Sequence, residues 1–288
     1  MRTPIAALLI AIAIFGGIPA YSQTRPVGAP LPIVPMVSPF TYADVADLAA
    51  IAPLVVDARI RSASVLPPER ASGISPDKVR FYVEADVIAL IRGAGPLGAR
   101  IAWLVDLPRD TRGKPPKLAK QRLLVFARPV STGQIALVAP DAQLVWDSAT
   151  DALARRVIGE VVKPGAPEAI TGIANGFHQA GTLPGEGESQ FFIETRSGEP
   201  LTLSVISVPG KPRQWAAAFG EIVDGGAAVP MRDTLGWYRL ACGLPRSLPS
   251  GSLVGAGPTD QAAAAADYRF ILAQLGECRR TRKPPAPR

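Results

Sequence analysis

His178 is the only histidine in this 288-residue chain, so side-chain acid–base chemistry near neutral pH would centre on it. A serine hydrolase places a hydroxyl nucleophile beside the imidazole and a carboxylate that orients the ring. Ser189 follows an acidic Gly-Glu-Gly-Glu segment, and the chain has no Gly-x-Ser-x-Gly elbow. We therefore interpret His178 as an ordinary polar residue at the end of a strand. The alternative is a Ser/His/acid site.

Two acidic residues of that segment, Glu186 and Glu188, could act as paired carboxylates or contribute to a calcium site near Asn175. Calcium requires several more oxygen ligands at close spacing, and the local sequence does not supply them. A solvated turn that leads into a strand at Phe191 is the simpler interpretation. One histidine and two cysteines also exclude a classical zinc finger and a four-cysteine iron–sulfur cluster. We predict no cofactor and assign no catalytic residue.

Of the two cysteines, Cys242 ends one predicted helix and Cys278 lies just beyond the other. In an oxidising compartment such a pair most simply forms a disulfide that pins the helices together, with free thiols as the alternative. Closing this loop should stabilise the fold by on the order of 3 kcal/mol.

The amino-terminal segment has the pattern of a signal peptide. Arg2 precedes an apolar run at residues 5–18, and small residues stand at Ala20 and Ser22. The run is shorter than the roughly 20 residues that a bilayer requires, so cleavage after Ser22 is favoured over a retained anchor. The pattern predicts a protein of the periplasm or the exterior, without a membrane span in the mature chain. A proline-rich leader is predicted at residues 23–40.

The net charge is +7, and it falls to +6 when the segment that contains Arg2 is removed. Basic residues are most concentrated at residues 109–122, a stretch whose prolines and glycine predict a loop. It contains no aromatic side chain to stack on bases, so nucleic acid is not an expected partner. We interpret the stretch as a solvated connection, with anion binding as the alternative. The possible anion contacts are Arg109, Arg112, Lys114, Lys117, Lys120 and Arg122.

The first half of the chain reads as a short helix followed by strands. Thr41 can cap a helix that Pro53 stops. Alternating or continuous apolar runs predict strands at residues 54–65, 79–92, 99–107, 123–127 and 134–139. No helix among them is long enough for a parallel crossover, so an antiparallel barrel or sandwich is expected.

This arrangement at residues 54–139, with a long strand that ends in Leu90-Ile91-Arg92-Gly93 and a later Leu123-Leu124-Val125-Phe126, resembles secreted bacterial barrels. The barrels in question are of the oligonucleotide/oligosaccharide-binding or tissue-inhibitor type. The resemblance implies a barrel and no activity. The whole chain is similar in arrangement to secreted proteins of Gram-negative bacteria, which likewise implies no function.

The whole chain is predicted to be an α+β protein, and its second half contains both helices and strands. Ser148 and Asp151 form a capping-box pattern at the start of a bridging helix. A three-stranded meander follows at residues 190–195, 201–206 and 215–223, and a carboxy-terminal helical pair carries the cysteines, with Thr259 as a cap. The predicted divisions are a barrel-like domain at 41–146, the bridging helix at 147–163, an α+β domain at 164–278 and a basic disordered tail at 279–288.

Three fragments are similar to pieces of cyclophilin-type prolyl isomerases: Phe177-His178, Ser189-Gln190-Phe191-Phe192-Ile193 and the stretch at 219–225. The resemblance implies isomerase activity, with Phe191 as a core side chain. The family has an arginine after its Phe-His pair, whereas Gln179 stands here, and the intervals between the fragments differ.

The sequence has the pattern of an export signal, but it has no recognisable nucleophile, metal site or phosphate loop. This combination favours a non-enzymatic binding or structural module of the cell envelope. An anionic envelope component or another protein is its expected partner. The alternative is a folding factor that isomerises prolyl bonds.

Overall fold

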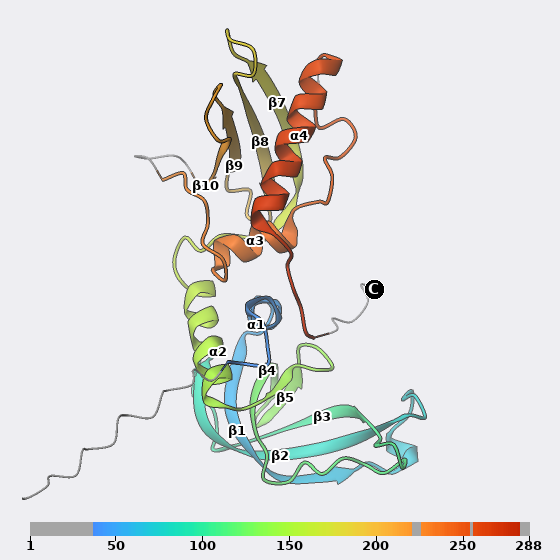
Figure 1. The fold of residues 1–288 in the computed structure, drawn as a ribbon. Coiled ribbons are helices and arrows are strands. Elements are labelled where there is room, and N and C mark those ends of the chain that lie inside the picture. The colour runs from blue at the N-terminus through green and yellow to red at the C-terminus, as the bar shows by residue number, and fades with distance from the viewer. Residues whose placement is uncertain (1–36, 221–225, 254–255, 283–288) are drawn as a thin grey trace, which may run out of the picture. The chain divides into compact units, whose positions relative to one another are not determined.

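The computed structural model describes residues 37–220, 226–253 and 256–282. The predicted signal peptide and most of the leader lie outside the described residues. The described chain contains a closed five-stranded β-barrel, a second, antiparallel sheet and four α-helices (Figure 1). The expected mixture of helices and strands, with a barrel in the first half, is confirmed.

The barrel consists of β1 (Leu54–Val65), β2 (Lys78–Arg92), β3 (Arg100–Pro108), β4 (Arg122–Ser131) and β5 (Gln134–Leu137). The strand order is β1-β2-β3-β5-β4, and pairing of β1 with β4 closes the ring. A short strand, β6 (Gln143–Val145), adds to β4. The five strands are close to the predicted ranges, because each one alternates or is continuously apolar as a barrel wall requires.

One junction of the barrel differs from the antiparallel arrangement that the sequence predicts. β3 and β5 pair in parallel, at Ala102 and Gln134. The reason is topological, since an odd number of strands in a closed ring cannot all alternate in direction. The other four junctions are antiparallel.

The inside of the barrel is filled by side chains of alternating residues. On β2, Val79, Phe81 and Val83 are buried, whereas the intervening residues point outward. Trp103 from β3 is among the largest side chains of the chain that are fully buried. The barrel interior is therefore a packed core rather than an open channel.

The second sheet has four strands, in the order β10-β9-β8-β7, where the sequence predicts three. They are β7 (Ile170–Ala180), β8 (Gly187–Thr195), β9 (Leu201–Ser207) and β10 (Gln214–Phe219). β7, which contains His178, is the strand for which no range is predicted from the sequence. Helix α4 (Pro258–Leu275) contacts β7 and β8, and its Tyr268 ring lies edge-on to Phe191 at 5.4 Å between centroids. Phe191 is fully buried, as predicted.

The remaining helices are α1 (Tyr42–Ala49), α2 (Ser148–Val161) and α3 (Leu235–Gly243). A carboxylate joins all three, because Glu160 of α2 accepts hydrogen bonds from the Tyr42 hydroxyl at 2.8 Å and from the Leu235 backbone N–H at 2.7 Å. Their buried side chains belong to one cluster that also includes residues of β4, of the second sheet and of α4. No helix of the described ranges has the length and apolar character to cross a bilayer.

Three helix starts test the predicted caps. Thr41 caps α1 in a reciprocal capping box with Asp44, as expected. The cap of α2 is Asp147, not Ser148, because its carboxylate accepts from the backbone of Thr150 and Ser148 becomes the first helical residue. The α4 helix starts at Pro258, one residue before the predicted cap, because proline is suited to the first helical position.

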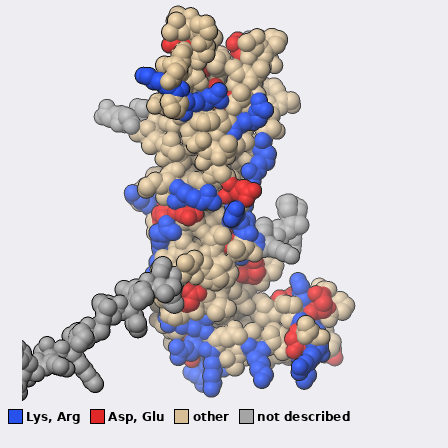
Figure 2. Space-filling view, viewed as in Figure 1, with Lys and Arg blue, Asp and Glu red and all other residues tan. Residues whose placement is uncertain are grey.

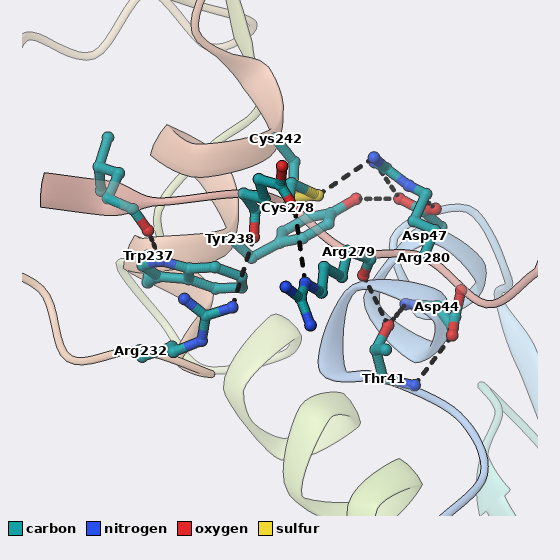
Figure 3. The surroundings of a disulfide bond; sticks show 12 residues. Thr41, Asp44, Asp47, Arg232, Trp237, Tyr238, Cys242, Cys278, Arg279 and Arg280 are labelled. Carbon is teal, nitrogen blue, oxygen red and sulfur yellow. Dashed lines mark hydrogen bonds and ion pairs between the residues drawn. A yellow bond between two sulfur atoms is a disulfide. The ribbon is translucent and has the colours of Figure 1, made fainter. Parts of the chain in front are cut away.

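A disulfide joins Cys242 at the end of α3 to Cys278 just beyond α4, as predicted. The chain that follows corrects a prediction. Residues 279–282, here named the C-terminal strap, are not a free tail. They lie along α1, where Arg280 faces Asp47 (Figure 3). Arg282 is only 9% exposed. Residues 283–288 lie outside the described residues.

The strap is ordered by carboxylates that the local sequence does not reveal. Asp44 accepts hydrogen bonds from the backbone N–H groups of Thr281 and Arg282, at 3.0 and 2.9 Å. The Arg282 guanidinium pairs with Asp141 through two bonds of 2.6 and 3.0 Å. Arg280 pairs in the same bidentate way with Asp47.

Candidate functional site

The loop that connects β3 to β4 contains most of the predicted anion contacts. We name residues 109–121 the basic loop. Its Arg109, Arg112, Lys114, Lys117 and Lys120 are all exposed. None of these five side chains forms an ion pair with a carboxylate in the part of the chain that the structure describes. Basic side chains appear across the face in Figure 2, with several of them over the barrel.

The backbone of the basic loop is held in place. The Asp110 carboxylate accepts hydrogen bonds from the backbone N–H groups of Arg112 and Lys114, at 2.9 and 2.7 Å. Leu118 is buried against the barrel interior, and the N–H of Lys120 donates to the carbonyl of Ile60 at 3.0 Å. The cationic side chains therefore project from a backbone with fixed anchors.

Arg122, the sixth predicted contact, has a different role. Its guanidinium donates two hydrogen bonds to the buried carboxylate of Asp57, at 2.9 and 2.6 Å, and it stacks 3.6 Å from the Trp146 ring centroid. The hydrogen bond to Asp57 raises the pKa of Arg122, against the opposing effect of desolvation. Arg122 is therefore part of the barrel wall, and we correct its assignment as an anion contact.

The structure brings His178 and Ser189 together, from β7 and β8, and adds Asp267 from α4. The Ser189 hydroxyl donates to Asp267 Oδ2 at 2.6 Å and lies 2.9 Å from His178 Nδ1. Arg213 approaches the other carboxylate oxygen at 3.2 Å. Asp267 is not recognisable from the sequence, because it is 78 residues from Ser189 and lies in a helix without any local motif.

This cluster does not have the geometry of a hydrolase. In a catalytic triad the serine and the carboxylate contact opposite nitrogens of the imidazole. Here both face Nδ1, with Asp267 at 3.7 Å. Ser189 is fully buried, and an added Cβ at Gly187 would lie 2.8 Å from His178 Nε2, so the backbone covers that side of the ring. The cluster is a buried polar connection between α4 and the second sheet.

The acidic segment and the isomerase-like fragments occupy the same sheet. Glu186 accepts hydrogen bonds from the backbone N–H groups of Thr182 and Leu183, whereas Glu188 accepts from the Gln190 amide, so the two carboxylates have separate partners. Within residues 37–220, 226–253 and 256–282, no three side chains of the metal-ligating types are grouped to hold an ion. Residues 221–225 of the third fragment lie outside the described residues.

Two larger hollows differ in charge. A groove of about 690 Å³ lies beside β3 and β5. Its Arg80 and Asp106 form an ion pair through two hydrogen bonds of 2.7 and 2.8 Å, so their charges neutralise each other. A second cavity, of about 750 Å³, is lined by segments around α1, α2, α3 and the C-terminal strap. Among the described residues that line it are three arginines, Arg156, Arg232 and Arg279, and one acidic residue, Asp233. We name it the arginine cavity.

Sequence reasoning misses the arginine cavity because its three arginines come from three distant segments, each without a pattern of its own. No model of a known protein family matches the chain, and no curated protein is significantly similar to it. The site therefore has to be interpreted from its own chemistry.

Proposed function

We propose that the protein is a non-enzymatic binding module of the cell envelope that uses the basic loop to contact an anionic envelope component. One observation carries the proposal: five exposed cations without acidic partners project from a single anchored loop. Each basic side chain near an anionic surface contributes about 1 kcal/mol. Five of them together provide substantial binding without a pocket.

The location that we propose is the periplasm or the exterior of the cell. The amino-terminal pattern of Arg2, the apolar run and the small residues at Ala20 and Ser22 supports export. The Cys242–Cys278 disulfide is typical of proteins that fold in an oxidising compartment.

The finer architecture is part of the same proposal. The closed five-stranded ring at residues 54–137 supports a barrel of the oligonucleotide/oligosaccharide-binding or tissue-inhibitor type. In the second half, we propose that β8, β9 and β10 form the expected meander, with β7 as an added edge strand. We further propose that α3 and α4 act as a helical pair tied by the disulfide. Barrels of this kind bind many unrelated ligands, so the basic loop and not the fold identifies the partner class.

Flotation with lipid vesicles tests the proposal. The mature chain, from residue 23 onward, should bind vesicles that contain phosphatidylglycerol and not vesicles of phosphatidylcholine alone. A variant with Arg109, Arg112, Lys114, Lys117 and Lys120 replaced by Gln should bind at least about tenfold more weakly.

A matched control neutralises five exposed cations elsewhere: Arg59, Arg128, Lys163, Lys211 and Arg269. It has the same net charge as the loop variant and should keep most of the affinity. Equal loss in both variants would mean that overall charge drives binding, which would overturn the loop as the contact surface.

The rival function is prolyl isomerisation. A coupled assay on the purified mature chain should give the uncatalysed rate of isomerisation. Clear catalysis would replace the binding module with a folding factor.

A further inference from the structure

We propose that the arginine cavity is a second binding site, and that it takes a phosphate monoester. The proposal does not depend on the basic loop, because the two sites share no residue. It follows from the charge of the cavity, from the way its arginines are held and from its size.

Two of the arginines are pre-positioned by aromatic rings. The Arg156 guanidinium lies 5.3 Å from the ring centroid of Tyr42, and that of Arg232 lies 5.0 Å from the ring of Trp237. Both distances are within the range of a cation–π interaction. Stacking holds a guanidinium without neutralising its charge.

Backbone carbonyls provide the other anchors. Arg156 Nη1 donates to the carbonyl of Asp233 at 2.8 Å, and Arg232 Nη2 approaches the carbonyl of Glu277 at 3.4 Å. Neither arginine forms an ion pair with a carboxylate among the residues that the structure describes. Since a guanidinium has five N–H donors, most donors of both side chains are available to a ligand.

The third arginine comes from the C-terminal strap. Figure 3 shows Arg232 and Arg279 extending into the same space beside Trp237, and both line the cavity. The backbone carbonyl of Arg279 accepts a hydrogen bond from the Thr41 hydroxyl at 2.9 Å, which fixes the strap here. Its side chain is 77% exposed, and its contact with Glu277 at 3.5 Å is between two solvated groups. Such a pair contributes little and is readily exchanged for a ligand.

The chemistry of three guanidinium groups selects the ligand. Their planar forks match the oxygens of a phosphate in bidentate geometry, and a monoester carries roughly −1.5 to −2 charges at pH 7. The cavity, at about 750 Å³, is larger than inorganic phosphate requires and has room for an attached group of sugar size. A soluble sugar phosphate and the headgroup of a phosphorylated lipid present the same monoester.

Calorimetry with glucose 1-phosphate tests the soluble source, and vesicles with phosphatidic acid test the lipid source. Both arms use the loop-neutralised variant, so that the basic loop contributes nothing to the signal. We expect saturable binding in one arm or both. The arm that responds identifies the source.

Arg156→Gln with Arg232→Gln should lower the affinity at least tenfold, whereas a control pair, Arg59→Gln with Arg269→Gln, should leave it unchanged. Because the anchored arginines also contact Tyr42 and Trp237, thermal unfolding must accompany the titration. Arg279→Gln is the second test, since its exposed side chain can be changed with little effect on the melting temperature. It should still weaken binding several-fold.

Two results would overturn the site. One is that protein with a normal melting temperature binds neither probe at millimolar concentrations. The other is equal affinity in the arginine variants and the control pair. Neither result bears on the vesicle binding proposed for the basic loop, so the two proposals fail separately.

Discussion

Two hydrogen bonds join Asp44 to Arg282, although 238 residues separate them. The Arg282 backbone N–H donates to the Asp44 carboxylate at 2.9 Å, and its guanidinium donates to the Asp44 carbonyl at 3.0 Å. The first helix of the described fold is thereby joined to the last residues that the structure describes. The stability of that fold should therefore depend on the charge of Asp44.

Replacing Asp44 by Asn should make the free energy of unfolding depend less on pH in the acidic range. Burial alone would raise the pKa of Asp44, but hydrogen bonds from Thr281, Thr41 and Arg282 outweigh burial and lower it. A carboxyl with a lowered folded pKa stabilises the protein above its unfolded pKa of about 3.9, and this stability is lost as the pH falls through the folded pKa.

The Asn variant should be destabilised by about 2–3 kcal/mol at pH 7, with a smaller loss between pH 5 and pH 2 than the wild type. Urea unfolding over that pH range measures it, with the exposed Glu69→Gln as the control. Parallel pH profiles of the Asn variant and the wild type would contradict the role given to Asp44.

Removing the disulfide should destabilise the fold and loosen the strap. The Cys242→Ser, Cys278→Ser double variant should lose about 3–4 kcal/mol, because the bond closes a loop of 36 residues. Reductant should lower the stability of the wild type to that of the variant and leave the variant unchanged. Insensitivity of the wild type to reductant would show that the bond does not contribute.

Arg122→Gln should destabilise the barrel rather than weaken anion binding. The change leaves the carboxylate of Asp57, only 1% exposed, without its partner. We expect a loss of roughly 2–4 kcal/mol, partly recovered in the Asp57→Asn, Arg122→Gln double variant. Arg128→Gln, on the same strand but exposed, is the control and should be near neutral. If Arg122→Gln mainly weakens vesicle binding at unchanged stability, our correction is wrong.

Ser189→Ala should lower the stability of the protein, because the cluster of Ser189, His178 and Asp267 is structural and not catalytic. The substitution removes the donor that reaches the buried Asp267 carboxylate, with an expected cost of about 1–3 kcal/mol. Thermal unfolding measures the cost, and Ser197→Ala on an exposed turn serves as the comparison. Hydrolysis of any ester or amide by the wild type that disappears with His178→Ala would reverse this interpretation of the cluster.

The elements that the sequence predicts well are those whose pattern is local. Alternation on β2 and the apolar run at the start of β1 follow from burial on a barrel wall, and the Thr41 cap follows from one side chain. The sequence does not predict β7, because Gly172 and Gly176 interrupt the strand pattern. At Gly176 an added Cβ would lie 2.8 Å from the Phe191 ring, so packing against the neighbouring strand requires a residue of low strand propensity.

The sites were less predictable because their residues meet only after folding. The composition of residues 109–122 identifies the basic loop, but not that Arg122 turns toward Asp57 while the other five cations stay exposed. Likewise, the basic residues after Cys278 read as a solvated tail until the carboxylates of Asp44, Asp47 and Asp141 are brought beside them.

A fluorophore placed in the basic loop tests most directly whether this loop contacts an anionic surface. An environment-sensitive dye on Thr111→Cys should change its emission when phosphatidylglycerol vesicles are added, and the change should disappear at high salt. The same dye on Ser197→Cys, on an exposed turn of the second sheet, should not respond. A response at position 197 without one at position 111 would show that another surface makes the contact.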